Sequence, residues 1–309
     1  MSACKTRCSR LATILVSMIA FLPLQPAWSA AAQQASATAP QPRTATFTIQ
    51  EDVPYASVNG TELHLDVYEP AGRGTGTRPA VVLIHGGGWA SLDKRTMRGM
   101  GQFLARAGYV AFSVDYRLVQ GDQNSWPAQH DDVQRAVRWA RANAAQYGVN
   151  PERIGAFGHS AGAQLAALLG MEDTRDNSDA ALAKYSSKVQ AVVDVSGPSD
   201  FTREHESEAE FLTDFFGAPY SVNPEAWRGA SPVYHVSKDD APFLIVHGTE
   251  DQAVPISQAQ ELFDKLQAAG VPVSFVKVND AHTFQSPEVR RQLAFESLGF
   301  FNRYLIVTH

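Results

Sequence analysis

Short hydrophobic runs typical of β-strands alternate with helical patterns along most of this chain. The clearest strand candidates are Leu63–Tyr68, Ala80–Ile84, Val110–Val114, Ile154–Phe157, Val189–Val195, Phe243–Val246 and Val273–Val278. The last of these are nearly continuous apolar runs, as expected of strands that helices cover on both faces. The alternation predicts an α/β fold with a mostly parallel central sheet flanked by helices.

Two of the helices have recognisable ends. One is predicted to begin with the capping-box pair Ser257 and Gln260 and to end at Gly270. The last helix is predicted to begin with Ser286 as its N-cap and Pro287 at its first position.

The alternation is interrupted between Ser196 and Asp240. An acidic stretch at 204–210 is followed there by four aromatic residues, Phe211, Phe215, Phe216 and Trp227. We predict a small helical lid over residues 196–240, placed at the carboxyl ends of the strands, where open α/β sheets bind ligands. The charges of this stretch are equally consistent with a solvated face.

The first thirty residues have a different character from the rest. Lys5, Arg7 and Arg10 precede an apolar run at 11–24, and small residues follow at 27–32. This order is typical of a cleaved signal peptide, and the run is shorter than the roughly twenty residues of a membrane-spanning helix, which is the alternative. We therefore predict a signal peptide over 1–30, no stable membrane insertion, and a secreted or periplasmic protein.

Loss of residues 1–30 would remove three basic residues and no acidic ones, so the net charge would change from −6 to −9. Such an acidic chain without a basic cluster argues against binding to nucleic acid. Cys4 and Cys8, the only cysteines, would leave with the signal peptide. The mature protein is therefore expected to have neither a disulfide nor a thiolate metal site.

Residues 31–45 are small, polar and proline-containing, which predicts a disordered lead-in. No further linker and no internal repeat follow. We predict one catalytic domain over residues 46–309.

The sequence Gly158-His159-Ser160-Ala161-Gly162 is the clearest chemical motif. It follows a predicted strand and opens a helical pattern. A G-x-S-x-G motif in a strand–turn–helix setting is typical of a nucleophile elbow, where a tight turn exposes the serine hydroxyl. Ser160 is therefore the predicted nucleophile.

A glycine run, His85-Gly86-Gly87-Gly88-Trp89, follows the predicted strand that ends at Ile84. Glycines at this position let backbone amides point into a site, where they can stabilise a developing oxyanion. We predict that the amides of Gly87, Gly88 and Ala161 form an oxyanion hole. A flexible turn is the plain alternative, and a phosphate-binding P-loop is excluded because no Lys-Ser/Thr pair follows.

A serine nucleophile needs a base, and the base needs an acid to orient it. Of the nine histidines, His282 lies in the loop after the last strand and is the predicted base. Asp251, after the preceding strand, is the predicted acid, with Glu250 beside it and Asp200 as the alternative. The other histidines in the motifs, such as His85, are expected to make packing or backbone contacts.

The two glycine motifs, the run Asp115-Tyr116-Arg117-Leu118 and the order serine, aspartate, histidine resemble the esterase/lipase group of α/β-hydrolases. The resemblance covers about residues 50–305 and is greatest to the branch of bifunctional feruloyl and acetyl-xylan esterases. It implies an α/β-hydrolase fold, the Ser160, Asp251 and His282 triad, and the same three oxyanion amides. Two departures matter: residues 31–79 are too few for the large N-terminal cap of some relatives, and Ala163 replaces a glycine of prolyl-oligopeptidase-like peptidases.

These features predict a serine carboxylesterase that hydrolyses short-chain acyl or aryl esters through an acyl-enzyme intermediate. Acetyl and feruloyl groups on plant polysaccharide are candidate substrates, and Trp89 or Trp227 is predicted to offer a flat surface to an aromatic or sugar group. An amide-cleaving relative such as an arylformamidase or peptidase is the alternative, and a binding protein on an inactive hydrolase scaffold is a third. No metal or cofactor is expected, and the oligomeric state stays open.

The composition of the predicted lid indicates the acyl chain length of the preferred substrate. The predicted lid is short and acidic and has few aromatic residues for its length. It would therefore bury few methylene groups of an acyl chain, each of which contributes ~0.8 kcal/mol to binding when buried. Activity is therefore expected to peak at acetyl to butyryl esters.

Overall fold

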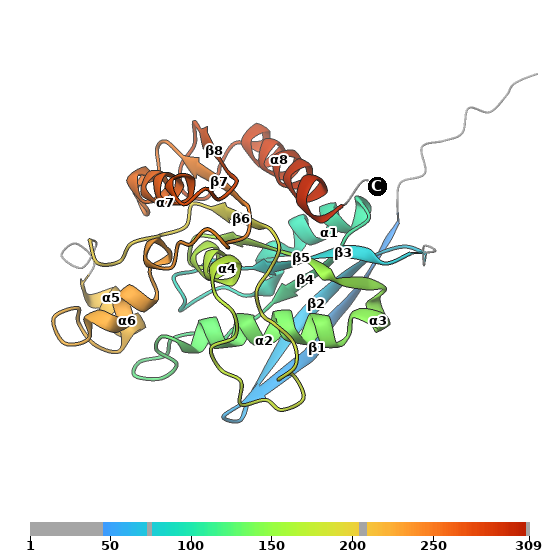
Figure 1. Cartoon of the computed structure of the whole chain (residues 1–309), viewed down its shortest axis with the longest axis horizontal. Helices are drawn as coiled ribbons and strands as arrows, with labels where there is room; N and C mark the ends of the chain where they lie inside the picture. Colours follow the sequence, from blue (N-terminus) through green and yellow to red (C-terminus); the bar gives the residue numbers. More distant parts are fainter. Residues whose placement is uncertain (1–45, 73–75, 204–208, 307–309) are drawn as a thin grey trace, which may run out of the picture. The chain divides into compact units, whose positions relative to one another are not determined.

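An eight-stranded sheet forms the centre of the computed structural model (Figure 1). Its strands are β1 (Phe47–Val58), β2 (Thr61–Pro70), β3 (Arg78–Ile84), β4 (Val110–Val114), β5 (Val149–His159), β6 (Val192–Val195), β7 (Phe243–Gly248) and β8 (Val273–Val278). They lie in the order β1-β2-β4-β3-β5-β6-β7-β8, with β2 antiparallel to both of its neighbours and the other pairs parallel. The predicted mostly parallel sheet is confirmed.

The structure describes residues 46–72, 76–203 and 209–306. All of them lie in one compact unit, Arg43–His309. The predicted signal peptide (1–30), the predicted lead-in (31–45) and most of the acidic stretch (204–208) lie outside the described residues.

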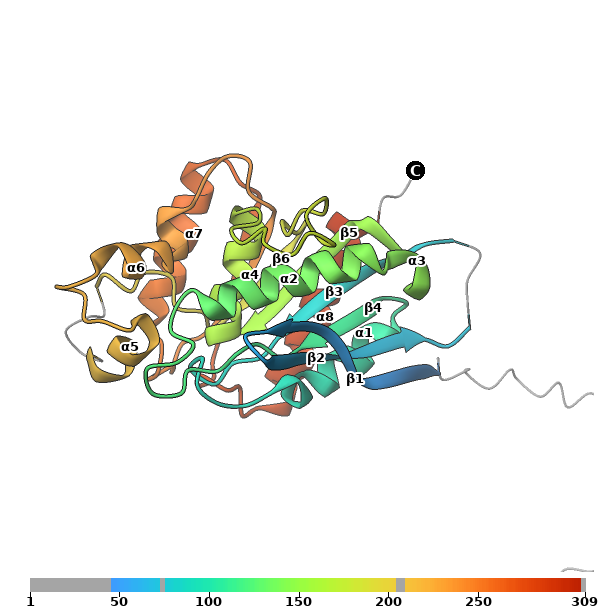
Figure 2. The same cartoon turned by 90° about the horizontal axis from the view of Figure 1, so that it is seen from below.

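Helices cover both faces of the sheet (Figures 1 and 2). One face carries α1 (Arg98–Arg106) and α8 (Pro287–Leu305), which pack with Val81, Leu83 and Ala111. The opposite face packs with α2 (Ala128–Ala142), α4 (Ala161–Met171) and α7 (Ile256–Ala268). Successive strand residues point to opposite faces, so an apolar run such as 80–84 supplies both cores. The short helices η1 (Lys94–Met97) and α3 (Ala144–Tyr147) complete this part of the fold.

The strand predictions hold with small shifts of their ends. The strands predicted at 110–114 and 273–278 have the observed bounds. Strand β6 begins at Val192, three residues later than predicted, because the amide of Val189 donates instead to the carbonyl of Leu169 in α4.

One helix start was predicted correctly and one was wrong. The Ser286 hydroxyl accepts a hydrogen bond from the Val289 amide and Pro287 is the first residue of α8, as predicted. The capping box at Ser257 is absent because α7 begins at Ile256, after Pro255, so Ser257 already lies inside the helix. Gln260 instead donates to Asp264.

In the region predicted as a lid, the described residues 196–203 and 209–240 form three short helices, α5 (Ala209–Phe216), α6 (Pro224–Gly229) and η2 (Pro232–Tyr234). Its interior is aromatic, contrary to the expectation that the lid is poor in aromatic residues. Trp89 stacks on Phe215 with ring centroids 4.0 Å apart, and Phe216 stacks on Trp227 at 4.2 Å. These lid side chains belong to the same buried cluster as the face of the sheet that packs with α2, α4 and α7.

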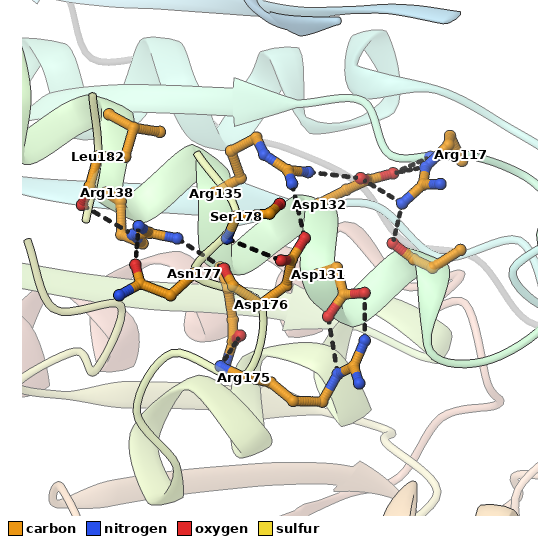
Figure 3. Close-up of polar contacts among 12 residues, drawn as sticks. Arg117, Asp131, Asp132, Arg135, Arg138, Arg175, Asp176, Asn177, Ser178 and Leu182 are labelled. Carbon is orange, nitrogen blue, oxygen red and sulfur yellow. Dashed lines mark hydrogen bonds and ion pairs between the residues drawn. The ribbon is translucent and has the colours of Figure 1, made fainter. Parts of the chain in front are cut away.

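A network of ion pairs fastens α2 to its surroundings (Figure 3). Asp132 accepts two hydrogen bonds of 2.8 Å from the guanidinium of Arg117 and lies 3.4 Å from Arg135. Arg135 also pairs with Asp176 at 2.9 Å. Two-pronged arginine–carboxylate pairs hold both partners in a fixed geometry, so the segment after β4 is held rigidly against α2.

Candidate active site

Ser160 occupies a tight turn between β5 and α4. Its backbone has φ 56° and ψ −123°, a conformation that non-glycine residues rarely adopt. Neighbouring backbone leaves no space for side chains on either flank: a Cβ at Gly158 would overlap the Gly162 carbonyl, and one at Gly162 would overlap the Ile84 carbonyl. The turn has the geometry predicted for a nucleophile elbow and places the Ser160 hydroxyl at the end of the strand.

Three side chains from separate loops form a hydrogen-bonded chain at this turn. The Ser160 hydroxyl lies 2.9 Å from Nε2 of His282, and Nδ1 of His282 lies 2.7 Å from Oδ2 of Asp251. Because a carboxylate only accepts hydrogen bonds, Nδ1 carries the proton and Nε2 is free to accept one from serine. Asp200, the alternative acid, is engaged elsewhere: it accepts from Thr202 and pairs with Arg203.

Asp251 is buried and surrounded by donors. Its Oδ1 accepts from the amides of Ala253 and Val254, both at 2.9 Å. Its Oδ2 also lies 3.2 Å from Nε2 of His247. Burial raises the pKa of Asp251, but hydrogen bonds from His247, His282 and the Val254 amide outweigh it and hold the pKa well below its usual range. The carboxylate therefore stays ionised. The sequence predicted packing or backbone contacts for His247, and it does contact the Val254 carbonyl at 2.9 Å, but its contact with the Asp251 carboxylate was not predicted.

The loop that carries His282 is held from the elbow itself. Nε2 of His159 donates to the His282 carbonyl at 2.9 Å. Burial lowers the pKa of His159, so its ring is neutral. It holds the His282 loop in place without adding a charge near the imidazole of His282. This is the backbone contact that the sequence predicted for a histidine inside the motif.

The glycine run forms a tight loop beside Ser160. Gly87 and Gly88 have φ values of +102° and +57°, and a Cβ at Gly88 would lie 2.5 Å from Cζ of Phe211. Gly88 and Ala161 line the same pocket as Ser160, whereas Gly87 is not among its lining residues. Within the described part of the chain, the amides of Gly87, Gly88 and Ala161 donate to no protein acceptor. They are available to a ligand oxygen.

A mostly apolar cavity of about 210 Å³ opens at Ser160. Its walls are formed by Gly88, Trp89, Ser160, Ala161, Pro198, Phe201, Phe211, Leu212, Ala253, Val254, Pro255, Gln258 and His282. Phe211 and Leu212 come from α5 of the lid, so the lid closes one side of the cavity. Sequence reasoning had no signal for Pro198 or Pro255, which come from the loops after β6 and β7.

The two tryptophans predicted to contact substrate have different positions. Trp89 is a wall of the cavity, with its Nε1 bonded to Gln164 at 3.1 Å and its ring stacked on Phe215. The prediction for Trp227 is wrong. Trp227 is 1% exposed, and its ring stacks on Phe216 and donates through Nε1 to the Ala218 carbonyl, so it packs inside the lid and does not line the cavity.

Glu172 joins the end of α4 to the lid. Its carboxylate lies 2.7 Å from Nδ1 of His235, just after η2, and 3.6 Å from Nε2 of His130 on α2. Burial raises the pKa of Glu172, but the two imidazoles outweigh it and lower the pKa to about 2. Burial lowers the pKa of His235, but Glu172 outweighs it and raises the pKa. Helix α4, which begins directly after Ser160, is therefore followed by an ion pair with the lid.

The free energy of unfolding of the Glu172→Gln variant should be about 1–2 kcal/mol below that of the wild type near pH 5.5. This value allows for solvent screening, because the Glu172 carboxylate is only half-buried. A raised histidine pKa contributes stability at low pH that is lost as pH rises through the folded-state value, and a lowered glutamate pKa contributes stability that is lost as pH falls toward 2. The loss should therefore be largest near pH 5–6 and smaller at pH 9, as measured by urea unfolding. Glu225→Gln, at an exposed lid glutamate, is the control. An equal loss at both pH values would contradict the ion pair.

The described residues contain no group of three or more histidine, cysteine, aspartate or glutamate side chains that could hold a metal ion. In the same residues, no helix is both long and apolar enough to cross a bilayer.

Comparison with known proteins identifies esterases among similar chains. A curated relative, the probable carboxylic ester hydrolase LipM of Mycobacterium tuberculosis, is 31% identical over 74% of this chain and 54% of its own length. The chain spans about half the length of the curated relatives that it matches.

Two solved structures share the fold. A truncated carbohydrate esterase from gut microbiota has a TM-score of 0.72 and 27% identity, covering 85% of this chain and 98% of that one. The thermophilic esterase Est2 of Thermogutta terrifontis, solved with butyrate bound, has a TM-score of 0.73 and 25% identity, covering 86% and 97%. The fold is therefore the α/β-hydrolase fold that the sequence predicted. The BD-FAE family model matches residues 65–266, more than half of the sequence, and the chain belongs to the BD-FAE family.

Proposed function

We propose that the protein is a serine carboxylesterase that hydrolyses short-chain acyl or aryl esters. The observation that carries the proposal is the hydrogen-bonded chain from Ser160 through His282 to Asp251, placed at a strained turn on the floor of an apolar cavity. The similarity to LipM and to the two solved structures, all ester hydrolases, supports the same reaction class.

In the proposed mechanism, the Ser160 oxygen attacks the ester carbonyl while Nε2 of His282 takes the serine proton. Asp251, ionised, stabilises the imidazolium that forms. The amides of Gly87, Gly88 and Ala161 donate to the negative oxygen of the tetrahedral intermediate. His282 then gives its proton to the departing alcohol, and water repeats the sequence on the acyl-enzyme to release the acid.

The cavity supports a small acyl group. Its volume of about 210 Å³ lies below the range of about 300–1,000 Å³ that is usual for larger ligands. Phe211 and Leu212 close it on the lid side. Acetyl and feruloyl esters on plant polysaccharide remain the candidate natural substrates, and the structural similarity to a carbohydrate esterase from gut microbiota supports them.

The acyl preference gives a direct test. Among p-nitrophenyl esters, kcat/KM should peak between acetyl and butyryl and fall at least about tenfold by octanoyl, because a longer chain loses the ~0.8 kcal/mol per methylene that burial supplies. Leu212→Ala should move the optimum to longer chains. Val222→Ala, at a lid residue that is 72% exposed and outside the cavity, should leave it unchanged.

A maximum at decanoyl or longer would contradict the proposed cavity. The same panel should include methyl ferulate, acetylated xylan and N-formylkynurenine. Turnover of the last compound with none of the esters would replace the proposal by the amide-cleaving alternative.

We also propose that the protein acts outside the cytoplasm, in the periplasm or as a secreted protein. The support is the order of a basic segment, an apolar run and small residues within residues 1–32.

A further inference from the structure

Each of the three amides in the proposed oxyanion hole belongs to a peptide group whose carbonyl is itself held by a hydrogen bond. A trans peptide is planar, so its N–H points opposite to the carbonyl of the preceding residue. Fixing that carbonyl therefore fixes the direction of the amide. The three carbonyls that matter here are those of Gly86, Gly87 and Ser160.

Backbone turns hold two of these carbonyls. The Ser160 carbonyl accepts from the amide of Ala163 at 2.9 Å, inside the first turn of α4. The Gly87 carbonyl accepts from the Ser91 amide at 3.0 Å and from its hydroxyl at 2.8 Å. Local chain geometry is thus sufficient to aim the amides of Ala161 and Gly88.

The Gly86 carbonyl is held by side chains. Nδ1 of His85 lies 2.7 Å from it, and the Tyr116 hydroxyl lies 3.3 Å from it and 3.0 Å from the His85 carbonyl. The two rings are stacked, with centroids 4.2 Å apart and planes 8° apart. Both side chains are buried.

His85 and Tyr116 hold the Gly86 carbonyl in place while both side chains are uncharged. A carbonyl oxygen only accepts hydrogen bonds, so Nδ1 of His85 must carry the proton. Burial lowers the pKa of His85 and raises that of Tyr116, so both rings stay neutral near pH 7. Neither side chain is among the residues that line the cavity at Ser160.

Tyr116 is fixed by its neighbours in sequence. Arg117 forms the two-pronged pair with Asp132 on α2, which Arg135 supports from the other side (Figure 3). On the other flank, Asp115 accepts from the Lys94 amide at 2.8 Å. The backbone on both sides of Tyr116 is therefore anchored to elements outside the glycine run.

We propose that His85 and Tyr116 are positioning residues, which turn the Gly86–Gly87 peptide so that the Gly87 amide faces the oxyanion. The inference rests on the proposed esterase function. It gives Tyr116, in the Asp115–Leu118 run, a role in the reaction.

Two conservative variants test the proposal because each keeps an aromatic ring in the stack. His85→Phe should lower kcat for p-nitrophenyl acetate about 100-fold, and Tyr116→Phe about tenfold, since loss of one oxyanion donor costs about 100- to 1,000-fold. KM should stay within about twofold. Affinity for an aryl trifluoromethyl ketone, which forms a tetrahedral oxyanion adduct with serine, should fall by the same factors as kcat.

Tyr109→Phe is the matched control, since it removes another buried tyrosine hydroxyl, bonded to Asn302 at 2.8 Å and remote from the glycine loop. It should retain the kcat of the wild type. If His85→Phe does not fold, Tyr116→Phe decides alone. The positioning role would be overturned if the wild type is active and the His85→Phe and Tyr116→Phe variants keep its kcat, or differ from it only in KM. A wild type without ester turnover would instead overturn the proposed function.

Discussion

The Ser160→Ala variant is expected to hydrolyse p-nitrophenyl acetate with a kcat at least about 10⁴-fold below that of the wild type, while its thermal unfolding stays within a few degrees. Removing a serine nucleophile removes the acyl-enzyme route and leaves only the contribution of binding and the oxyanion amides. The substitution deletes one oxygen and leaves the backbone turn, which the flanking glycines permit, in place.

A second serine provides a close control for this loss. Ser196 also lies at the end of a parallel strand with a positive φ, +53°, and its buried hydroxyl has no partner among the described residues. Ser196→Ala should therefore keep the activity of the wild type. Equal losses in the two variants would show that a general disturbance of the strand ends, and not the Ser160 hydroxyl, explains the effect.

Replacing Asp251 by asparagine should lower kcat by about 10⁴-fold with little change in KM. An asparagine amide can donate to Nδ1 of His282, which moves the imidazole proton to Nε2 and prevents it from accepting the serine proton. The carboxylate is suited to the opposite task, because hydrogen bonds from His247 and His282 keep it ionised although burial opposes this.

Asp200→Asn separates the two candidate acids. Asp200 is buried, like Asp251, but it is bonded to Thr202 and Arg203, away from His282. This variant should retain kcat within a few-fold of the wild type, as measured by steady-state kinetics on the same ester. A large loss in Asp200→Asn together with normal activity in Asp251→Asn would reverse the assignment.

The residues of the candidate triad were predictable because their positions follow from topology. Parallel strands end at one edge of a sheet, so residues just after β5, β7 and β8 meet there whatever the intervening helices do. Glycines at 158 and 162 marked the turn, and steric overlap at both positions explains why only glycine fits. Short apolar runs similarly located the strands.

The contacts that depend on tertiary packing were not predictable. Trp227 was expected to be open to substrate, but its stacking on Phe216 depends on how two lid helices meet. The capping box at Ser257 failed because Pro255 and the loop bonded to Asp251 start the helix earlier. The supporting role of Tyr116 depends on a contact with Gly86, thirty residues earlier in the chain, which no local pattern reveals. His247 lies only four residues before Asp251, but its contact with the carboxylate depends on how the loop after β7 folds back.

The most direct test of Ser160 as the nucleophile is to treat the protein with paraoxon and map the modified residue by peptide mass spectrometry. An organophosphate phosphorylates an activated serine, and the structural neighbour Est2 has been solved in its paraoxon-phosphorylated form. We expect one phosphoryl group per chain, on Ser160, formed in proportion to the loss of ester hydrolysis. Modification of a different residue, or complete modification of Ser160 with activity retained, would contradict the proposed mechanism.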